Sequence, residues 1–189
     1  MILKNMIHKD NFTEDVYTAL QQLDSQTLSH SIRANNIAEE IEHELNDSKH
    51  LLSDAALVHD IGKLYISSAI LNKLKQLTTL ERQIINYHSY YGYEILKNMN
   101  VDEKICKIVL YHHGVNPPVL NSIPGCEDKQ IFVYARMLHT IDVYEALTSK
   151  RVYRNSYSRE DALKLIENET DYDCNYDKFV INFLKQSRI

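Results

Sequence analysis

Several histidine and aspartate residues of this 189-residue chain could together bind metal ions. Imidazole nitrogens and carboxylate oxygens suit transition metals such as Fe, Mn, Zn or Ni. Lys63 follows one of the aspartates, Asp60, by three residues, which places the two on one face of a helix. A lysine beside a metal site suits an anionic substrate. The candidate donors are His30, His59, Asp60, His88, His112, His113 and Asp142.

Each of these residues has an ordinary structural explanation when taken alone, because most single histidines are packed or solvated. Asp142 is harder to explain, since it lies within the apolar stretch MLHTIDVYEAL and a buried carboxylate needs a partner. That partner is either an arginine or a metal. Gly62 and Lys63 are also unusual helix-interior residues after the apolar run AALVHD. The combination favours a metal site, whereas His139, one turn before Asp142, is expected to be a packed histidine.

Helices must position these donors, because the apolar residues recur with helical spacing along almost the whole chain. Val16, Leu20 and Leu23, for example, are four and three residues apart. Helices are expected at 13–23, 27–45, 55–64, 79–98, 103–113, 129–149, 160–168 and 175–187. Residues that could cap helices are Ser53, Thr78 with Glu81 in a capping box, Asp102 and Ser158. The turn-rich segment 114–128 holds all three prolines and is expected to be a long, functional loop.

The composition is that of a globular protein, with 44% hydrophobic and 25% charged residues. The length suggests one main domain, 25–189, with residues 1–24 as a helical appendage. A net charge of −5 argues against a protein dedicated to nucleic-acid polymers. No apolar run is long enough for a membrane span, so no membrane partner is expected. Three scattered cysteines argue against a disulfide framework or a cysteine-rich zinc site, and we expect a cytoplasmic protein.

The sequence resembles the HD superfamily of metal-dependent phosphohydrolases, and within it the HD-GYP branch. The resemblance covers about residues 25–154 and lies in the strings HSIRANNIAEEI, LLSDAALVHDIGKLYISSAILNKLKQLTTLERQIINYHSYYGYEIL, YHH and YARMLHTIDVYEALTSKRVYR. It implies an all-α helical bundle with about five core helices and accessory helices at both ends. It also implies hydrolysis of a cyclic dinucleotide, chiefly cyclic di-GMP, because members of this branch act on such substrates.

The resemblance also assigns roles to individual residues. The candidate donors from His30 to Asp142 all match family metal ligands, and Asp60 would bridge two ions. Lys63 matches the residue that contacts the scissile phosphate, and Arg151 and Arg154 match positions that hold substrate phosphates. The implied cofactors are two divalent transition metals, with Fe or Mn favoured over Zn or Ni. The implied reaction is attack of a metal-bridging hydroxide on phosphorus.

Several positions depart from the family pattern, among them Lys150, where an acidic or small polar residue is usual, and Val152, where proline is usual. Gly114 stands where the family has a glutamate after the His-His pair, and segment 114–128 lacks the Gly-Tyr-Pro sequence. Gln26 lies four residues before His30, where members with three metals have a glutamate. A neutral amide is a poor substitute for that ligand, so two metals are expected.

Three other interpretations remain open at this stage. The same site could act on another nucleotide, since the Gly-Tyr-Pro segment is missing. The chain could instead be a catalytically silent module that binds a cyclic dinucleotide in signalling. A purely structural bundle would leave Asp60 and Asp142 inside apolar helices without a metal. A homodimer or a signalling-protein partner is compatible with each interpretation.

Overall fold

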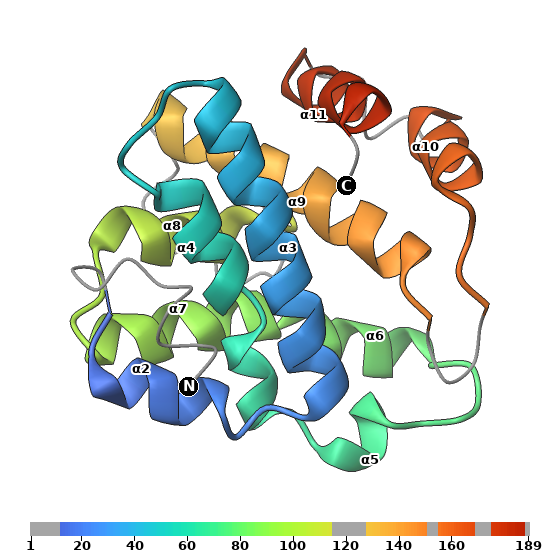
Figure 1. Ribbon diagram of the computed structural model, residues 1–189. Coiled ribbons are helices and arrows are strands. Elements are labelled where there is room, and N and C mark those ends of the chain that lie inside the picture. Colours follow the sequence, from blue (N-terminus) through green and yellow to red (C-terminus); the bar gives the residue numbers. More distant parts are fainter. Residues whose placement is uncertain (1–11, 115–127, 151–154, 169–174, 188–189) are drawn as a thin grey trace.

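The part of the protein that the structure, a computed structural model, describes is built from α-helices and one 3-10 helix (Figure 1). The structure describes residues 12–114, 128–150, 155–168 and 175–187, and these contain no β-strand. The predicted all-α class is therefore confirmed. No helix in this part of the chain combines the length and apolar character that a membrane span needs. The elements are α2 (Glu14–Leu20), α3 (Ser25–Glu44), α4 (Leu51–Val58), η1 (Ile61–Tyr65), α5 (Ser68–Leu71), α6 (Thr79–Asn86), α7 (His88–Asn98), α8 (Glu103–Tyr111), α9 (Lys129–Thr148), α10 (Arg159–Asn168) and α11 (Asn175–Gln186).

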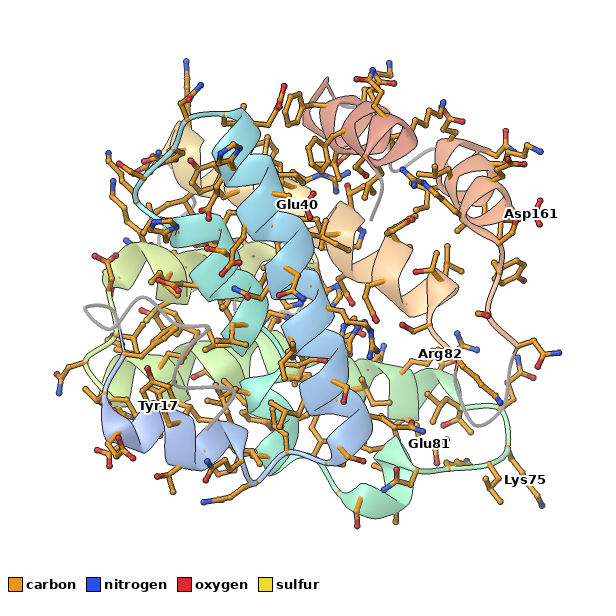
Figure 2. All side chains as sticks on the ribbon, viewed as in Figure 1. Tyr17, Glu40, Lys75, Glu81, Arg82 and Asp161 are labelled. Carbon is orange, nitrogen blue, oxygen red and sulfur yellow. The ribbon has the colours of Figure 1, made fainter. Side chains whose placement is uncertain are left out.

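The core lies where α3, α4, α8 and α9 pack against one another. Leu52, Ile105 and Leu138 are fully buried there, and each such side chain stabilises the fold by about 1.5–3 kcal/mol relative to exposure. Val16 and Leu20 of α2, in the predicted N-terminal appendage, belong to the same apolar cluster. Helices α10 and α11 pack along α9 on the other side of the bundle (Figure 1). Charged side chains such as Lys75 and Asp161 point outward, as Figure 2 shows.

Local capping signals were predicted correctly at three helix starts. Thr78 and Glu81 form a reciprocal capping box at the start of α6. The amide of Lys104 donates to Asp102 Oδ1 at 2.7 Å at the start of α8. The Ser158 hydroxyl accepts from the amide of Asp161 at 3.1 Å beside α10. These signals act within one turn, so they do not depend on the rest of the fold.

The predicted cap at Ser53 is wrong, because α4 begins two residues earlier, at Leu51. The buried side chain of Glu42, on α3, takes the capping role instead. Its Oε1 accepts from the amides of Leu52 at 2.7 Å and Ser53 at 3.3 Å. A carboxylate from a neighbouring helix thus satisfies amides that have no intrahelical acceptor.

The predicted single helix over 79–98 is also wrong, since α6 ends at Asn86 and α7 begins at His88. At this junction the carbonyl of Ile85 lies 2.7 Å from His88 Nδ1, and the carbonyl of Asn86 accepts from the Ser89 hydroxyl at 3.2 Å. Side chains therefore occupy carbonyls that a continuous helix would use for its backbone. The break places the imidazole of His88 at the start of α7.

Gly62 explains why the helix expected over 55–64 ends early. The α-helix stops at Val58, and residues 61–65 form the tighter 3-10 helix η1, which packs against α7. A Cβ on Gly62 would lie 1.9 Å from the carbonyl oxygen of His88 and 2.5 Å from the amide nitrogen of Gly92. Only glycine permits this backbone approach. The contact brings Asp60, just before η1, next to His88.

Candidate metal centre

Three of the candidate histidines sit at helix ends, and their Nδ1 atoms bind backbone carbonyls. His59 and His112 directly follow α4 and α8, and His88 follows the junction after α6. Carbonyls in the last turn of a helix have no intrahelical donor, so a ring N–H can satisfy them. This fixes the proton on Nδ1 and leaves the Nε2 lone pair available to a metal. The Nδ1–O distances are 2.8 Å from His59 to Ala56, 2.7 Å from His88 to Ile85 and 2.6 Å from His112 to Val109.

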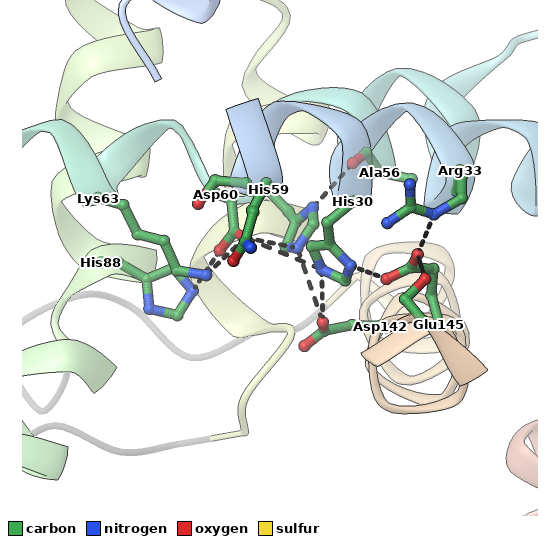
Figure 3. A network of polar contacts seen from close by, with 12 residues as sticks. His30, Arg33, Ala56, His59, Asp60, Lys63, His88, Asp142 and Glu145 are labelled. Atoms are coloured by element: carbon green, nitrogen blue, oxygen red, sulfur yellow. Dashed lines mark hydrogen bonds and ion pairs between the residues drawn. The ribbon is translucent and has the colours of Figure 1, made fainter. Parts of the chain in front are cut away.

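All the predicted donors meet in one region of the bundle. Figure 3 shows Asp60 between His59 and His88. Asp60 Oδ1 lies 3.4 Å from His88 Nε2, and Oδ2 lies 3.5 Å from His59 Nε2. One carboxylate therefore faces two sets of imidazoles. The groups whose donor atoms lie within 4.8 Å of one another are His88, His112 and His113; His30, His59 and Asp60; and His59, His112 and Asp142.

Asp142 on α9 faces the ring nitrogens of α3 and α4. Its Oδ1 lies 2.9 Å from His30 Nε2 and 3.9 Å from His59 Nε2. The partners that the structure gives this carboxylate are thus imidazoles, which with Asp142 form a donor set for a metal. His139, one turn earlier, belongs to no donor group among the described residues. Its ring instead packs edge-on against that of His113, with centroids 5.6 Å apart.

Burial and charge set the protonation of the cluster without metal. Burial, with the nearby positive charge of Lys63, lowers the pKa of His88 to about 4. Burial and the neighbouring His88 lower the pKa of His113 to about 3. Burial opposes the ionisation of Asp60, but Lys63 and the surrounding histidines hold its pKa well below its usual range. Asp60 is therefore ionised, and His88 and His113 are neutral, at neutral pH, which is the protonation state in which these groups bind metals.

His30 differs from His88 and His113 in its protonation. Burial disfavours its cation, but hydrogen bonds to Asp142 and Glu145 raise its pKa to about 9. Burial opposes the ionisation of Asp142, but the hydrogen bond between His30 and Asp142 helps to hold the pKa of Asp142 well below its usual range. Metal binding at neutral pH would therefore displace a proton from this ring.

The donor set fits a divalent transition metal. His59 Nε2 is buried and has no hydrogen-bond partner among the described residues. Leaving such a group unsatisfied costs about 1–3 kcal/mol, and an ion held between His59 and its neighbours would remove that cost. The mixture of imidazole and carboxylate donors matches the preference of Fe, Mn, Zn and Ni.

A polar pocket of about 370 Å³ opens beside the donors. Lys63 lies on its wall and donates from Nζ to Asp60 Oδ2 at 2.6 Å. Arg33 and Lys150 bring two more cationic groups to the same pocket. The predicted phosphate contacts Arg151 and Arg154, and segment 115–127, lie outside the described residues. The other lining residues are Asp24, Ser25, Gln26, Thr27, Ser29, His30, Asp60, Leu71, Asn72, Glu145 and Ser149.

One buried residue beside the donors was not anticipated from the sequence. Glu145 on α9 is only 2% exposed, and its carboxylate accepts a hydrogen bond from His30 Nδ1. The available signal was its spacing of three residues from Asp142, which places both on one face of a helix.

Comparison with known sequences identifies the family of this helical protein. The profile described as HD domain matches residues 14–178, which is most of the chain. The chain therefore belongs to the HD domain family, as its resemblance predicted. A solved structure shares the fold: the HD domain of the phosphodiesterase PgpH from L. monocytogenes, determined in complex with cyclic-di-AMP, superposes with a TM-score of 0.63. That match has 20% sequence identity and covers 93% of this chain and 99% of the other.

Curated relatives match the central part of the chain. The 3'3'-cGAMP-specific phosphodiesterase 3 of Vibrio cholerae is 32% identical over 120 residues, which are 61% of this chain and 25% of the relative. Cyclic di-GMP phosphodiesterase PA4108 of Pseudomonas aeruginosa is 33% identical over 115 residues, 58% of this chain and 27% of the relative. A cyclic di-GMP phosphodiesterase of Thermotoga maritima is 29% identical over 171 residues, 84% of this chain and 45% of the relative. The chain thus spans less than half the length of these relatives.

Proposed function

We propose that this chain is a metal-dependent phosphodiesterase that hydrolyses a cyclic dinucleotide. The observation that carries the proposal is the meeting of histidine and aspartate donors on both sides of Asp60, beside a pocket bordered by Lys63. Membership of the HD domain family supports it, as do relatives named as cyclic di-GMP and 3'3'-cGAMP phosphodiesterases.

The donors would hold two divalent ions, with Fe or Mn as the first choices. When bound, the ions would polarise a phosphoryl oxygen and lower the pKa of a water molecule. Asp60 presents one oxygen to each half of the cluster, which suits a bridging carboxylate. Gln26, a neutral amide on the pocket wall, is the reason that we propose two ions rather than three. The two sets of ligands would be His30, His59 and Asp142, and His88, His112 and His113.

Substrate binding would fall to the cationic residues around the pocket. Lys63 touches Asp60 and borders the pocket, so its ammonium can offset charge on the phosphate as the transition state forms. Arg151 and Arg154 are proposed to hold substrate phosphates, because arginine makes paired contacts to phosphate oxygens. We propose cyclic di-GMP as the substrate to test first, with 3'3'-cGAMP as the nearest alternative, since relatives carry both names.

The direct test combines metal content with hydrolysis. Protein purified without oxygen and loaded with Mn²⁺ or Fe²⁺ should hold two metals per chain. It should convert cyclic di-GMP, or one of 3'3'-cGAMP and cyclic di-AMP, to a linear dinucleotide or mononucleotide. Asp60→Ala should lose metal and activity together, and a variant that keeps both would contradict the proposal. Tight binding of the nucleotide by the metal-loaded protein without turnover would instead support the silent signalling module.

A matched pair of histidine variants separates the metal centre from general effects. His30 and His43 both lie on α3, but His30 is buried among the donors and His43 is exposed to solvent. His30→Ala should bind less metal than the wild type, whereas His43→Ala should bind the wild-type amount. Equal metal content in both variants would remove His30 from the ligand set.

A further inference from the structure

Glu145 contacts His30 from the side of the ring that faces away from the other donors. It lies on α9 three residues after Asp142, so one face of this helix presents both carboxylates to α3. Its Oε2 accepts from His30 Nδ1, whereas His30 Nε2 lies 2.9 Å from Asp142 Oδ1 (Figure 3). Since the two nitrogens point away from each other across the ring, Glu145 is placed behind the ligand rather than among the ligands.

His30 needs such a partner because of its position in the fold. His59, His88 and His112 follow helix ends, where unused carbonyls accept their Nδ1 protons. His30 lies in the second turn of the long helix α3, where nearby carbonyls accept backbone amides. Its Nδ1 therefore requires an acceptor from another element, and Glu145 supplies one.

The carboxylate of Glu145 is itself held in place by two donors. Arg33 Nε and the Ser149 hydroxyl both donate to its Oε1, which leaves Oε2 directed at His30. Arg33 lies three residues after His30 on α3, so α3 supplies both the ring that Glu145 binds and one of the donors that hold the carboxylate of Glu145 on α9. These contacts fix the orientation of the carboxylate. A fixed carboxylate acceptor thus stands behind the ring of His30.

We propose that Glu145 is a positioning residue of the metal centre, which holds His30 with its proton on Nδ1 and its Nε2 open toward the ion. The inference rests on the proposed function, because it requires that His30 bind a metal. Carboxylates that bind the second nitrogen of a ligand histidine fix its tautomer and orientation, and their loss typically lowers metal affinity by about 10–100-fold. Glu145→Gln, which retains a neutral acceptor, should lie near the lower end of this range, and Glu145→Ala near the upper end.

Glu42→Gln is the matched control for this experiment. Glu42 is as deeply buried as Glu145 and lies on α3, but it binds the amides at the start of α4 instead of a candidate ligand. Titration of each metal-free protein with Mn²⁺, followed by electron paramagnetic resonance, gives the affinity without relying on catalysis. Glu145→Gln should bind Mn²⁺ about 10-fold more weakly, whereas Glu42→Gln should unfold at a lower temperature and bind Mn²⁺ like the wild type.

The visible spectrum of Co²⁺-loaded protein adds a readout that a purely structural role would not change. Glu145→Gln should shift the Co²⁺ bands relative to the wild type, and Glu42→Gln should not. Wild-type Mn²⁺ affinity and Co²⁺ bands in Glu145→Gln would overturn the inference, as would equal losses in the two variants. If Glu145→Gln does not fold, Arg33→Gln tests the same contact, because the half-exposed Arg33 side chain binds Glu145. Arg33→Gln should weaken Mn²⁺ binding. Wild-type Mn²⁺ affinity in Arg33→Gln would also overturn the inference. Failure of the wild type to bind metal would instead refute the proposed function.

Discussion

Replacing Gly62 with alanine should both destabilise the protein and disturb the metal centre. The added Cβ would lie 1.9 Å from the His88 carbonyl oxygen, whereas carbon and oxygen normally approach to about 3.3 Å. Helix η1 would therefore have to move away from α7 by about 1.4 Å, because the atoms in contact are backbone and cannot rotate aside. Asp60 and His88, now 3.4 Å apart between Oδ1 and Nε2, lie on the two sides of this contact.

Overpacking usually lowers the free energy of unfolding by about 1–3 kcal/mol, and we expect Gly62→Ala to lower it by at least the upper end of this range. Gly92→Ala is a graded control, since its Cβ would lie 3.1 Å from a Val109 methyl group that can shift. Alanine also favours the helix by up to about 1 kcal/mol over glycine, so Gly92→Ala should be nearly neutral. Urea unfolding gives the free energies, and mass spectrometry gives the bound metal. Wild-type unfolding free energy and metal content in Gly62→Ala would refute the reasoning.

Two further predictions concern buried titratable groups. The metal-free protein should be most stable near pH 6.5, the usual pKa of histidine. The pKa values of His88 and His113, about 4 and about 3, lie below this value. The pKa of His30, about 9, lies above it. The unfolded chain then binds more protons below pH 6.5 and fewer between pH 6.5 and 9. Thermal unfolding between pH 4 and 9 should show stability falling on both sides, and a flat profile would contradict these shifts. Cys106 is buried, and burial raises the pKa of its thiol to about 12. In a variant with serine at the other two cysteines, Ellman's reagent should therefore react with Cys106 at pH 8 only after unfolding. Rapid reaction of the folded protein would contradict the burial of this thiol.

The sequence singled out the histidines and aspartates that the structure brings close together, because their residue types are informative without tertiary structure. An adjacent His-Asp pair and an adjacent His-His pair in apolar helices are unusual, and the structure brings both pairs together. The capping box of Thr78 and Glu81 was predictable for a related reason, since its contacts span three residues. The helical class follows from the apolar spacing in the same way.

Features that depend on contacts between distant segments were not predictable. The break between α6 and α7 leaves no glycine or proline signal, since the residue at the junction is Tyr87. The role of Glu145 depends on how α9 crosses α3, because a glutamate three residues after an aspartate is common on exposed helix faces. Glu42 likewise caps a helix other than its own, which a pattern within one helix cannot indicate.

The position of the candidate ligands along the chain has a consequence for cooperativity. They come from α3, from the ends of α4 and α8, from the start of α7 and from α9, whereas the described parts of α2, α10 and α11 supply none. Ion binding would therefore tie the middle of the chain into one cooperative unit, and its stabilisation would grow with free metal concentration. The flanking helices could open at a free energy that metal does not change, so the protein would unfold in parts rather than as a whole when metal is abundant.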